Sequence, residues 1–159
     1  FSKAGSCEVM TAEGPAPVID YFSNQKTFIK LLRTYINDTL REYAKVEQPA
    51  CDIAVLTARK DLIPDGLFEP GVLSRPLARY KDAKKTDVVW ETIHGFKGLE
   101  ASTVILIGVE ELDDVQIRQL MYVGGSRART RLIWLLPEDC SGSVQAGLLA
   151  VQAQLNATI

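Results

Sequence analysis

The sequence predicts an α/β fold built on a mostly parallel sheet with helices on both faces. Three observations support this prediction. Short segments of strand character alternate along the chain with stretches of helical period. The strand segments are apolar at consecutive positions, as strands buried on both faces are. The 159 residues, of which 47% are hydrophobic and 24% charged, suit one globular domain.

The first third of the chain predicts a linker, a strand and a long helix. Residues 1–13 are expected to be a linker, and residues 14–159 the domain, because glycines and prolines punctuate the start without periodicity. Residues 18–22 form a short strand candidate. Apolar side chains then recur three, four and one positions apart over four turns, which puts an apolar face on a helix: Phe28, Leu31, Leu32, Tyr35, Ile36, Thr39, Leu40 and Tyr43.

The remaining elements alternate in the same way. Residues 60–85 contain several prolines and glycines, which predict turns and short pieces. A helix is expected from Asp114 to about Arg129, and a last helix from Ser143 toward Asn156. Ligands of such sheets bind in the loops after the carboxyl ends of the strands, so a functional site is expected in those loops. The strands are expected at residues 52–57, 88–93, 103–107 and 132–136.

Composition limits the function classes. The 18 Lys and Arg against 20 Asp and Glu give a net charge of −2, which argues against a uniformly basic nucleic-acid coat but not against a local basic groove. Cys7, Cys51 and Cys140 lie far apart, which favours reduced thiols over a zinc site or a disulfide framework. No apolar run approaches the ~20 residues of a membrane span and no signal peptide is present, so we expect a cytoplasmic protein without a membrane partner. The first residue, Phe1, is not Met, which suggests a piece of a longer polypeptide.

Residues 92–100 are the first candidate site, because they leave a strand and cross a loop. Gly95 and Gly98 let the backbone turn sharply and approach a ligand closely. Glu100 could accept hydrogen bonds from vicinal sugar hydroxyls. An ordinary glycine-containing connection is the alternative for this segment on its own. Side chains that can donate to phosphate oxygens gather in the same segment: Thr92, His94 and Lys97.

Residues 122–131 are the second candidate site. Gly124 and Gly125 would destabilise a helix by about 2 kcal/mol relative to two alanines. Their presence indicates that another group passes close to the backbone here, or that the helix ends early. Gly124 precedes Arg127 by three positions, so on a helix both lie on one face. That arrangement leaves space for the guanidinium of Arg127 to reach an anion. A solvated basic turn is the alternative.

An apolar strand followed by acidic residues, at positions 104–114, is similar to the magnesium-binding Walker B motif. That motif works together with a phosphate-binding P-loop, in which a glycine precedes a lysine. None of the 11 glycines in this chain is followed by Lys. We therefore expect no metal site, and expect the acidic side chains to form a solvated turn and a helix cap: Glu110, Glu111, Asp113 and Asp114.

In this order and spacing, the two candidate segments resemble motifs V and VI of the UvrD-like superfamily 1 DNA helicases. Residues 92–100 match the pattern T-x-H-x-x-K-G-L-E at every fixed position, and residues 122–128 resemble Y-V-A-x-T-R-A. Residues 14–21 resemble the opening of the family's second RecA-like domain, and residues 52–57 the strand of motif IV. The resemblance covers about residues 14–137. It implies a RecA-like fold of the P-loop NTPase kind that lacks its own P-loop.

The resemblance also implies roles for individual residues. Such helicases bind ATP and Mg²⁺ in a cleft between two RecA-like domains, and the first domain supplies the P-loop and the magnesium ligands. By its position, Arg127 is the arginine finger, and Glu100 contacts the ribose. Arg59 lies about one position from the motif IV arginine, a γ-phosphate contact, and Gly98 joins it in the nucleotide-binding set. The expected contacts to single-stranded DNA are Thr92, His94 and, more weakly, Lys97.

The chain departs from the family pattern in three places. Gly124-Gly125 replaces the usual Ala-x, and Ser126 replaces Thr but keeps the hydroxyl. Residues 59–89 are too few for the family's accessory insertion.

We therefore expect the C-terminal half of an ATP-dependent DNA helicase or translocase. Its partners would be single-stranded DNA and an N-terminal RecA-like domain, and the isolated chain should not hydrolyse ATP. One alternative is a non-catalytic RecA-like module that docks DNA or protein. A weaker one is a small doubly wound domain that binds an unrelated phosphorylated ligand.

Overall fold

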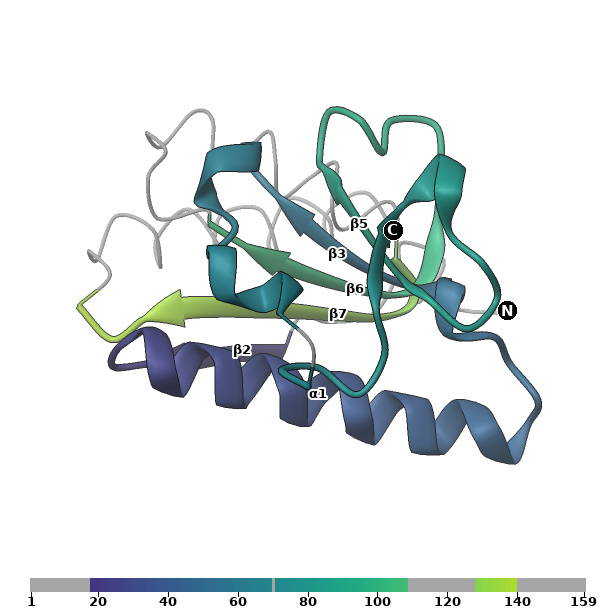
Figure 1. The fold of residues 1–159 in the computed structure, drawn as a ribbon, viewed down its shortest axis with the longest axis horizontal. Coiled ribbons are helices and arrows are strands. Elements are labelled where there is room, and N and C mark those ends of the chain that lie inside the picture. The colour runs from purple at the N-terminus through teal and green to yellow at the C-terminus, as the bar shows by residue number, and fades with distance from the viewer. Residues whose placement is uncertain (1–17, 70, 109–127, 140–159) are drawn as a thin grey trace, which may run out of the picture.

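A computed structural model describes residues 18–69, 71–108 and 128–139 (Figure 1). Within these residues six strands form one sheet in the order β2-β7-β6-β3-β5-β4. Every pair of neighbouring strands is parallel. The predicted α/β fold with a mostly parallel sheet is confirmed.

The strands coincide closely with the apolar segments of the sequence. All positions of β3 and β6 are buried, which explains why their apolar residues follow one another instead of alternating with polar ones. The short edge strand β4 was not foreseen and arises inside the segment of turns. The bounds are Val18–Phe22 for β2, Ile53–Thr57 for β3, Leu77–Arg79 for β4, Val88–Thr92 for β5, Ala101–Ile107 for β6 and Ala128–Pro137 for β7.

Strand β7 begins earlier than the sequence predicted. The expected helix reached to about Arg129, but Ala128 and Arg129 belong to the strand, so that part of the prediction is wrong. The physical reason is tertiary: Ala128 pairs with Ala101, and the Arg129 side chain binds carboxylates on neighbouring elements. The rest of that helix lies outside the described residues, as do the final helix and residues 1–17.

Helix α1, Gln25–Lys45, confirms the long amphipathic helix. It begins with a capping box, in which the Asn24 side chain accepts from the Thr27 N–H at 2.9 Å and the Thr27 hydroxyl accepts from the Asn24 N–H at 3.0 Å. Its apolar side runs along one face of the sheet (Figure 1). The buried side chains of the helix are Phe28, Leu32, Ile36, Thr39 and Tyr43.

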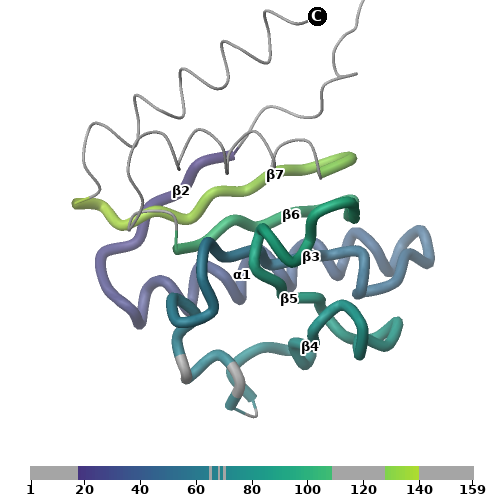
Figure 2. Tube along the Cα trace, turned by 90° about the horizontal axis from the view of Figure 1, so that it is seen from above, coloured from purple at the N-terminus to yellow at the C-terminus, as the bar shows by residue number. Residues whose placement is uncertain are grey.

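The opposite face of the sheet carries a second apolar cluster that includes Trp134 and Leu136 of β7. Within the described residues, Ile93 and Phe96 pack into this cluster. Both come from the connection between β5 and β6, and Figure 2 shows that connection beside β3. The candidate segment 92–100 is therefore anchored to the core by its own apolar residues.

Short turns of 3₁₀-helix occur in the connections that the structure describes, in keeping with the turns that the prolines and glycines of residues 60–85 predict. They lie before β3, between β3 and β4, and directly after β4. Their bounds are Ala50–Asp52 for η2, Lys60–Leu62 for η3, Asp65–Phe68 for η4 and Tyr80–Asp82 for η5.

Candidate functional site

The sheet register separates the candidate residues into two groups at opposite edges. At the carboxyl edge, where β3, β5 and β6 end, Thr57 pairs with both Thr92 and Ile107. At the amino edge, where β3, β6 and β7 begin, Glu100 directly precedes β6. Glu100 precedes Ile107 by seven residues of the chain, so the two edges lie roughly 20 Å apart at ~3.3 Å per strand residue.

At the amino edge, the guanidinium of Arg129 joins three elements. Its Nη2 donates to Oδ1 of Asp52 at 2.8 Å, to Oδ2 at 3.1 Å, and to Oγ of Ser102 at 3.1 Å. Its Nη1 donates to Oε1 of Glu100 at 3.3 Å. The end of η2 and the starts of β6 and β7 are thereby held together by one charged side chain.

Asp52 is the centre of this network. Its Oδ2 accepts from the Gln48 side-chain amide at 2.6 Å and from the Ser102 hydroxyl at 2.8 Å, and its Oδ1 accepts from the Ser102 N–H at 3.1 Å. Burial alone would raise the pKa of Asp52, but these hydrogen bonds and the Arg129 guanidinium outweigh it and hold the pKa below the ordinary value. The Asp52 carboxylate is thus ionised and saturated with donors at neutral pH.

Glu100 is more exposed than Asp52: its side chain is 60% exposed to solvent, against 20% for Asp52. Burial would lower the pKa of Arg129, but the hydrogen bond to Glu100 and the nearby Asp52 charge raise it, so the guanidinium stays charged. An exposed carboxylate oriented by a fixed cation is chemically suited to accept from the two hydroxyls of a ribose. The ribose contact that its motif implies for Glu100 stays a prediction.

Arg127 and the rest of motif VI before Ala128 lie outside the described residues. Ala128, to which Arg127 is bonded, pairs with Ala101, the residue after Glu100. The acidic residues expected to form a solvated turn, at positions 110–114, also lie outside the described part.

At the carboxyl edge, Thr92 forms a tight turn. Its hydroxyl accepts from the Gly95 N–H at 2.9 Å, and its carbonyl accepts from the Phe96 N–H at 3.0 Å. A Cβ on Gly95 would lie 2.9 Å from both Oγ1 of Thr92 and Oε1 of Glu91, so glycine is required here by close packing. His94, at the outside of the turn, is exposed.

Lys97 and Gly98 lie in the part of the connection that leads from this turn toward the amino edge, and both are exposed. Gly98 has φ +85°, a left-handed conformation that other residues adopt only at a cost. A Cβ at Gly98 would meet no atom within 4 Å. Glycine is therefore favoured at position 98 by the left-handed backbone conformation and not by close packing.

Arg59 follows β3 at the carboxyl edge, and its side chain is 56% exposed and lies 3.2 Å from Asp61. Its carbonyl accepts from the Thr57 hydroxyl at 3.0 Å. Arg59 thus lies at the edge of the sheet where β5 ends at Thr92, and at the opposite edge from Glu100. The two nucleotide-binding candidates Arg59 and Glu100 are not brought together.

The sequence did not predict a partly buried ion pair under the Thr92 turn. Glu91, with a side chain 8% exposed, accepts from Nη2 of Arg79 at 2.6 Å and from the Tyr80 N–H at 3.0 Å. Burial would raise the pKa of Glu91, but the Arg79 and Tyr80 hydrogen bonds outweigh it and lower the pKa. The Arg79 guanidinium also lies 4.5 Å from the centre of the Trp90 ring. A lone carboxylate inside an otherwise apolar strand was the signal available in the sequence.

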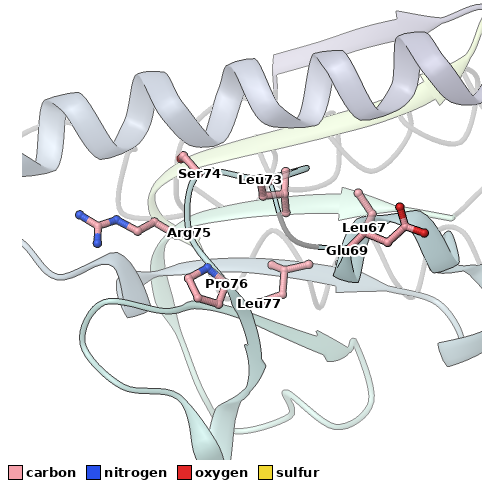
Figure 3. Close-up of a pocket in the computed structure, with 8 residues that line it drawn as sticks. Leu67, Glu69, Leu73, Ser74, Arg75, Pro76 and Leu77 are labelled. Carbon is pink, nitrogen blue, oxygen red and sulfur yellow. The ribbon is translucent and has the colours of Figure 1, made fainter.

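A hollow of about 340 Å³ lies between η4 and β4, away from the candidate motifs (Figure 3). Its lining mixes apolar side chains with Glu69, Ser74 and Arg75, and in Figure 3 the Arg75 guanidinium and the Glu69 carboxylate extend in opposite directions. The lining residues are Leu67, Glu69, Gly71, Leu73, Ser74, Arg75, Pro76 and Leu77.

Among the described residues, no group of three or more His, Cys, Asp or Glu side chains could hold a metal ion. In the same part of the chain, Cys51 is a free thiol. No helix that the structure describes has both the length and the apolar character needed to cross a membrane.

Comparison with known proteins adds to this geometry. Residues 87–135 match the family model of the UvrD-like helicase C-terminal domain, a segment that includes both candidate motifs. No curated protein sequence matches the chain. The fold is similar to the crystal structure of the C-terminal domain of a possible DNA helicase from Lactobacillus plantarum WCFS1, with a TM-score of 0.57 and 19% identity over 89% of each chain. Residues 87–135 are therefore similar in sequence to the UvrD-like helicase C-terminal domain, and the α/β fold is similar to that of a solved helicase C-terminal domain.

Proposed function

We propose that this chain is the second RecA-like domain of an ATP-dependent DNA helicase or translocase. It would supply the arginine finger and the ribose contact to an ATP site shared with an N-terminal P-loop domain, and part of the single-stranded DNA track. The observation that carries the proposal is the pairing of Ala101 with Ala128. This pairing puts Glu100 and the residue bonded to Arg127 side by side at the amino edge.

The nucleotide half of the proposal concerns this edge. Glu100 would accept from the ribose hydroxyls while Arg129 holds its carboxylate in place. Arg127 would reach the γ-phosphate as negative charge builds up in the transition state, a contribution of about 10³–10⁵ in rate for such fingers. Mg²⁺, held by the partner domain, would neutralise part of the phosphate charge. The chain alone should be inactive, because none of its glycines is followed by the P-loop lysine.

The DNA half of the proposal concerns the carboxyl edge and the connection that follows it. The Thr92 hydroxyl accepts from Gly95 and so keeps its own proton for a phosphate oxygen. His94 and Lys97 are exposed and can reach the same strand. Contacts of this kind bind the backbone without reading its sequence.

The test is the ATPase activity of a polypeptide that carries this chain together with a P-loop domain. Arg127→Ala should abolish DNA-stimulated hydrolysis, by about 10³-fold or more, while largely sparing nucleotide binding. Arg41→Ala is the matched control, because Arg41 lies on the exposed side of α1 and forms an ion pair with Asp38 of the same helix.

Two results would count against the proposal. Turnover near the wild-type rate in Arg127→Ala would exclude the finger role. A wild-type polypeptide that binds single strands but has no ATPase activity would favour the non-catalytic docking module instead.

A further inference from the structure

Tyr80 is the most exposed aromatic side chain among the described residues, at 51% of its full exposure. It follows Arg79, the last residue of β4, which pairs with Trp90 of β5. Tyr80 therefore lies near the carboxyl edge, beside the turn that Thr92 begins. About half of this residue remains exposed next to the turn and is available to a ligand.

Two contacts hold Tyr80 in place. Its N–H donates to the buried carboxylate of Glu91 at 3.0 Å. Its ring meets the ring of Phe96 edge to face, with 6.4 Å between centroids and 85° between planes. Phe96 is only 2% exposed and its own N–H donates to the carbonyl of Thr92. Tyr80 is thus fixed to both ends of the Thr92 turn while half of its side chain stays open to solvent.

Exposed cationic residues lie close to Tyr80 along the chain or next to its ring partner Phe96. Lys81 is the next residue along the chain, Lys97 follows Phe96, and both are exposed. In the described part of the chain neither of these two ammonium groups pairs with a carboxylate. His94 is exposed on the Thr92 turn itself. The surface around Tyr80 therefore combines an aromatic face with unpaired positive charge.

We propose that Tyr80 is a base-stacking residue for single-stranded DNA, with Lys81 and Lys97 placed for the phosphates on either side of the stacked nucleotide. This inference rests on the proposed function and extends the DNA track from Thr92 toward the β4 side of the sheet. Exposed aromatic rings beside cationic side chains bind single strands without sequence preference, because every base presents a π-face. A duplex hides those faces in its own stack, so the surface selects for a single strand.

The experiment measures the affinity of the 159-residue chain for two fluorescent strands of equal length, oligo-dT and the same backbone without bases. Tyr80→Leu keeps apolar bulk against Phe96 but removes the aromatic face. It should weaken oligo-dT binding by about 5-fold to 100-fold and change binding of the abasic strand by less than about 2-fold. Tyr80→Phe should bind both strands within about 2-fold of the wild type.

Tyr21→Leu is the matched control, because Tyr21 is 36% exposed and lies on β2 at the other end of the six-stranded sheet. It should leave both affinities unchanged. If Tyr80→Leu does not fold, as judged by its thermal unfolding, Tyr80→Trp decides. The larger ring should tighten oligo-dT binding and leave the abasic strand unchanged, and no difference between the strands would overturn the inference.

The remaining outcomes separate this inference from the proposed function. Equal losses on both strands, or no loss in Tyr80→Leu, would overturn the stacking role and leave the DNA track intact. If the wild-type chain binds neither strand even at low salt, the DNA half of the proposed function fails, and the stacking role fails with it.

Discussion

Nη2 of Arg129 lies 2.8 Å from Oδ1 of Asp52, although 77 residues separate them in the chain. The contact passes across the start of β6, because Asp52 precedes β3 and Arg129 is the second residue of β7. Ser102 of β6 binds both partners. The amino edge is therefore cross-linked by polar contacts over three neighbouring strands.

Arg129→Ala should destabilise the chain by about 1–2 kcal/mol, because it leaves the half-buried Asp52 carboxylate without its cation. Urea unfolding measures the change. Arg41→Ala, whose ion pair with Asp38 is exposed on α1, should cost no more than about 0.5 kcal/mol. Equal costs for the two variants would show that the Asp52 contact adds nothing beyond a surface ion pair.

The two carboxylates with lowered pKa values predict how stability depends on pH. Asp52 and Glu91 both titrate in the folded chain below their ordinary values of 3.8 and 4.5. The unfolded chain then binds protons more readily, so the stabilisation is complete above those values and is lost as the pH falls below them.

Glu91→Gln should therefore flatten the acid side of the curve of unfolding free energy against pH. Glu42→Gln, which removes an exposed carboxylate of α1, is the matched control. Urea titrations at a series of pH values from neutral to acid measure both curves. An acid slope in Glu91→Gln as steep as in the wild type would contradict the assignment.

Gly95→Ala and Gly98→Ala should be destabilising for different reasons. The new Cβ at position 95 would lie 2.9 Å from Glu91 and Thr92 oxygens, and forcing those apart should cost about 1–3 kcal/mol and disturb the Thr92 turn. At position 98 the space is open, so only the left-handed backbone resists, at about 1–2 kcal/mol.

Thermal unfolding and oligo-dT affinity distinguish the two glycine variants. Only Gly95→Ala should weaken DNA binding in addition to lowering the melting temperature. Loss of DNA binding confined to Gly98→Ala would mean that the Thr92 turn is not the contact.

Lys97→Ala should weaken single-strand binding to the same degree for every sequence. If its ammonium neutralises one phosphate, the slope of log affinity against log salt should fall by about 0.7. Anisotropy titrations at several salt concentrations measure this slope. Lys45→Ala, at the end of α1 and paired with Glu42, should leave it unchanged, and an unaltered slope in Lys97→Ala would remove that residue from the track.

The elements that the sequence predicted well are those with a strong local pattern. Helical spacing of apolar residues predicts helix α1, and consecutive apolar residues predict the strands β2, β3, β5 and β6. The short edge strand β4 and the first residues of β7 do not, because their extended form depends on pairing with distant strands. The register of strand pairing depends on the whole folded sheet and cannot be read from a short stretch of sequence.

In the candidate site, too, the local pattern was predictable from the sequence and the contacts between distant segments were not. The pattern of residues 92–100 identified Thr92 and Glu100 as a unit, and the structure puts them at the two ends of one connection. Spacing along the chain does not reveal that Arg59 lies at the opposite edge of the sheet from Glu100, or that Asp52 contacts Arg129. Those relations follow from strand order, which spacing along the chain does not encode.

The connection between β5 and β6 is short for a parallel crossover, which ordinarily takes a dozen or more residues. Residues 93–100 must cross β3 and run from the carboxyl edge of the sheet back to the amino edge, with Phe96 buried midway. The interval from Thr92 to Glu100 is thus dictated by the length of the strands beneath it. Deleting one residue would disrupt the turn at Thr92 or move Glu100 away from Arg129. This loop, unlike most, therefore cannot vary in length.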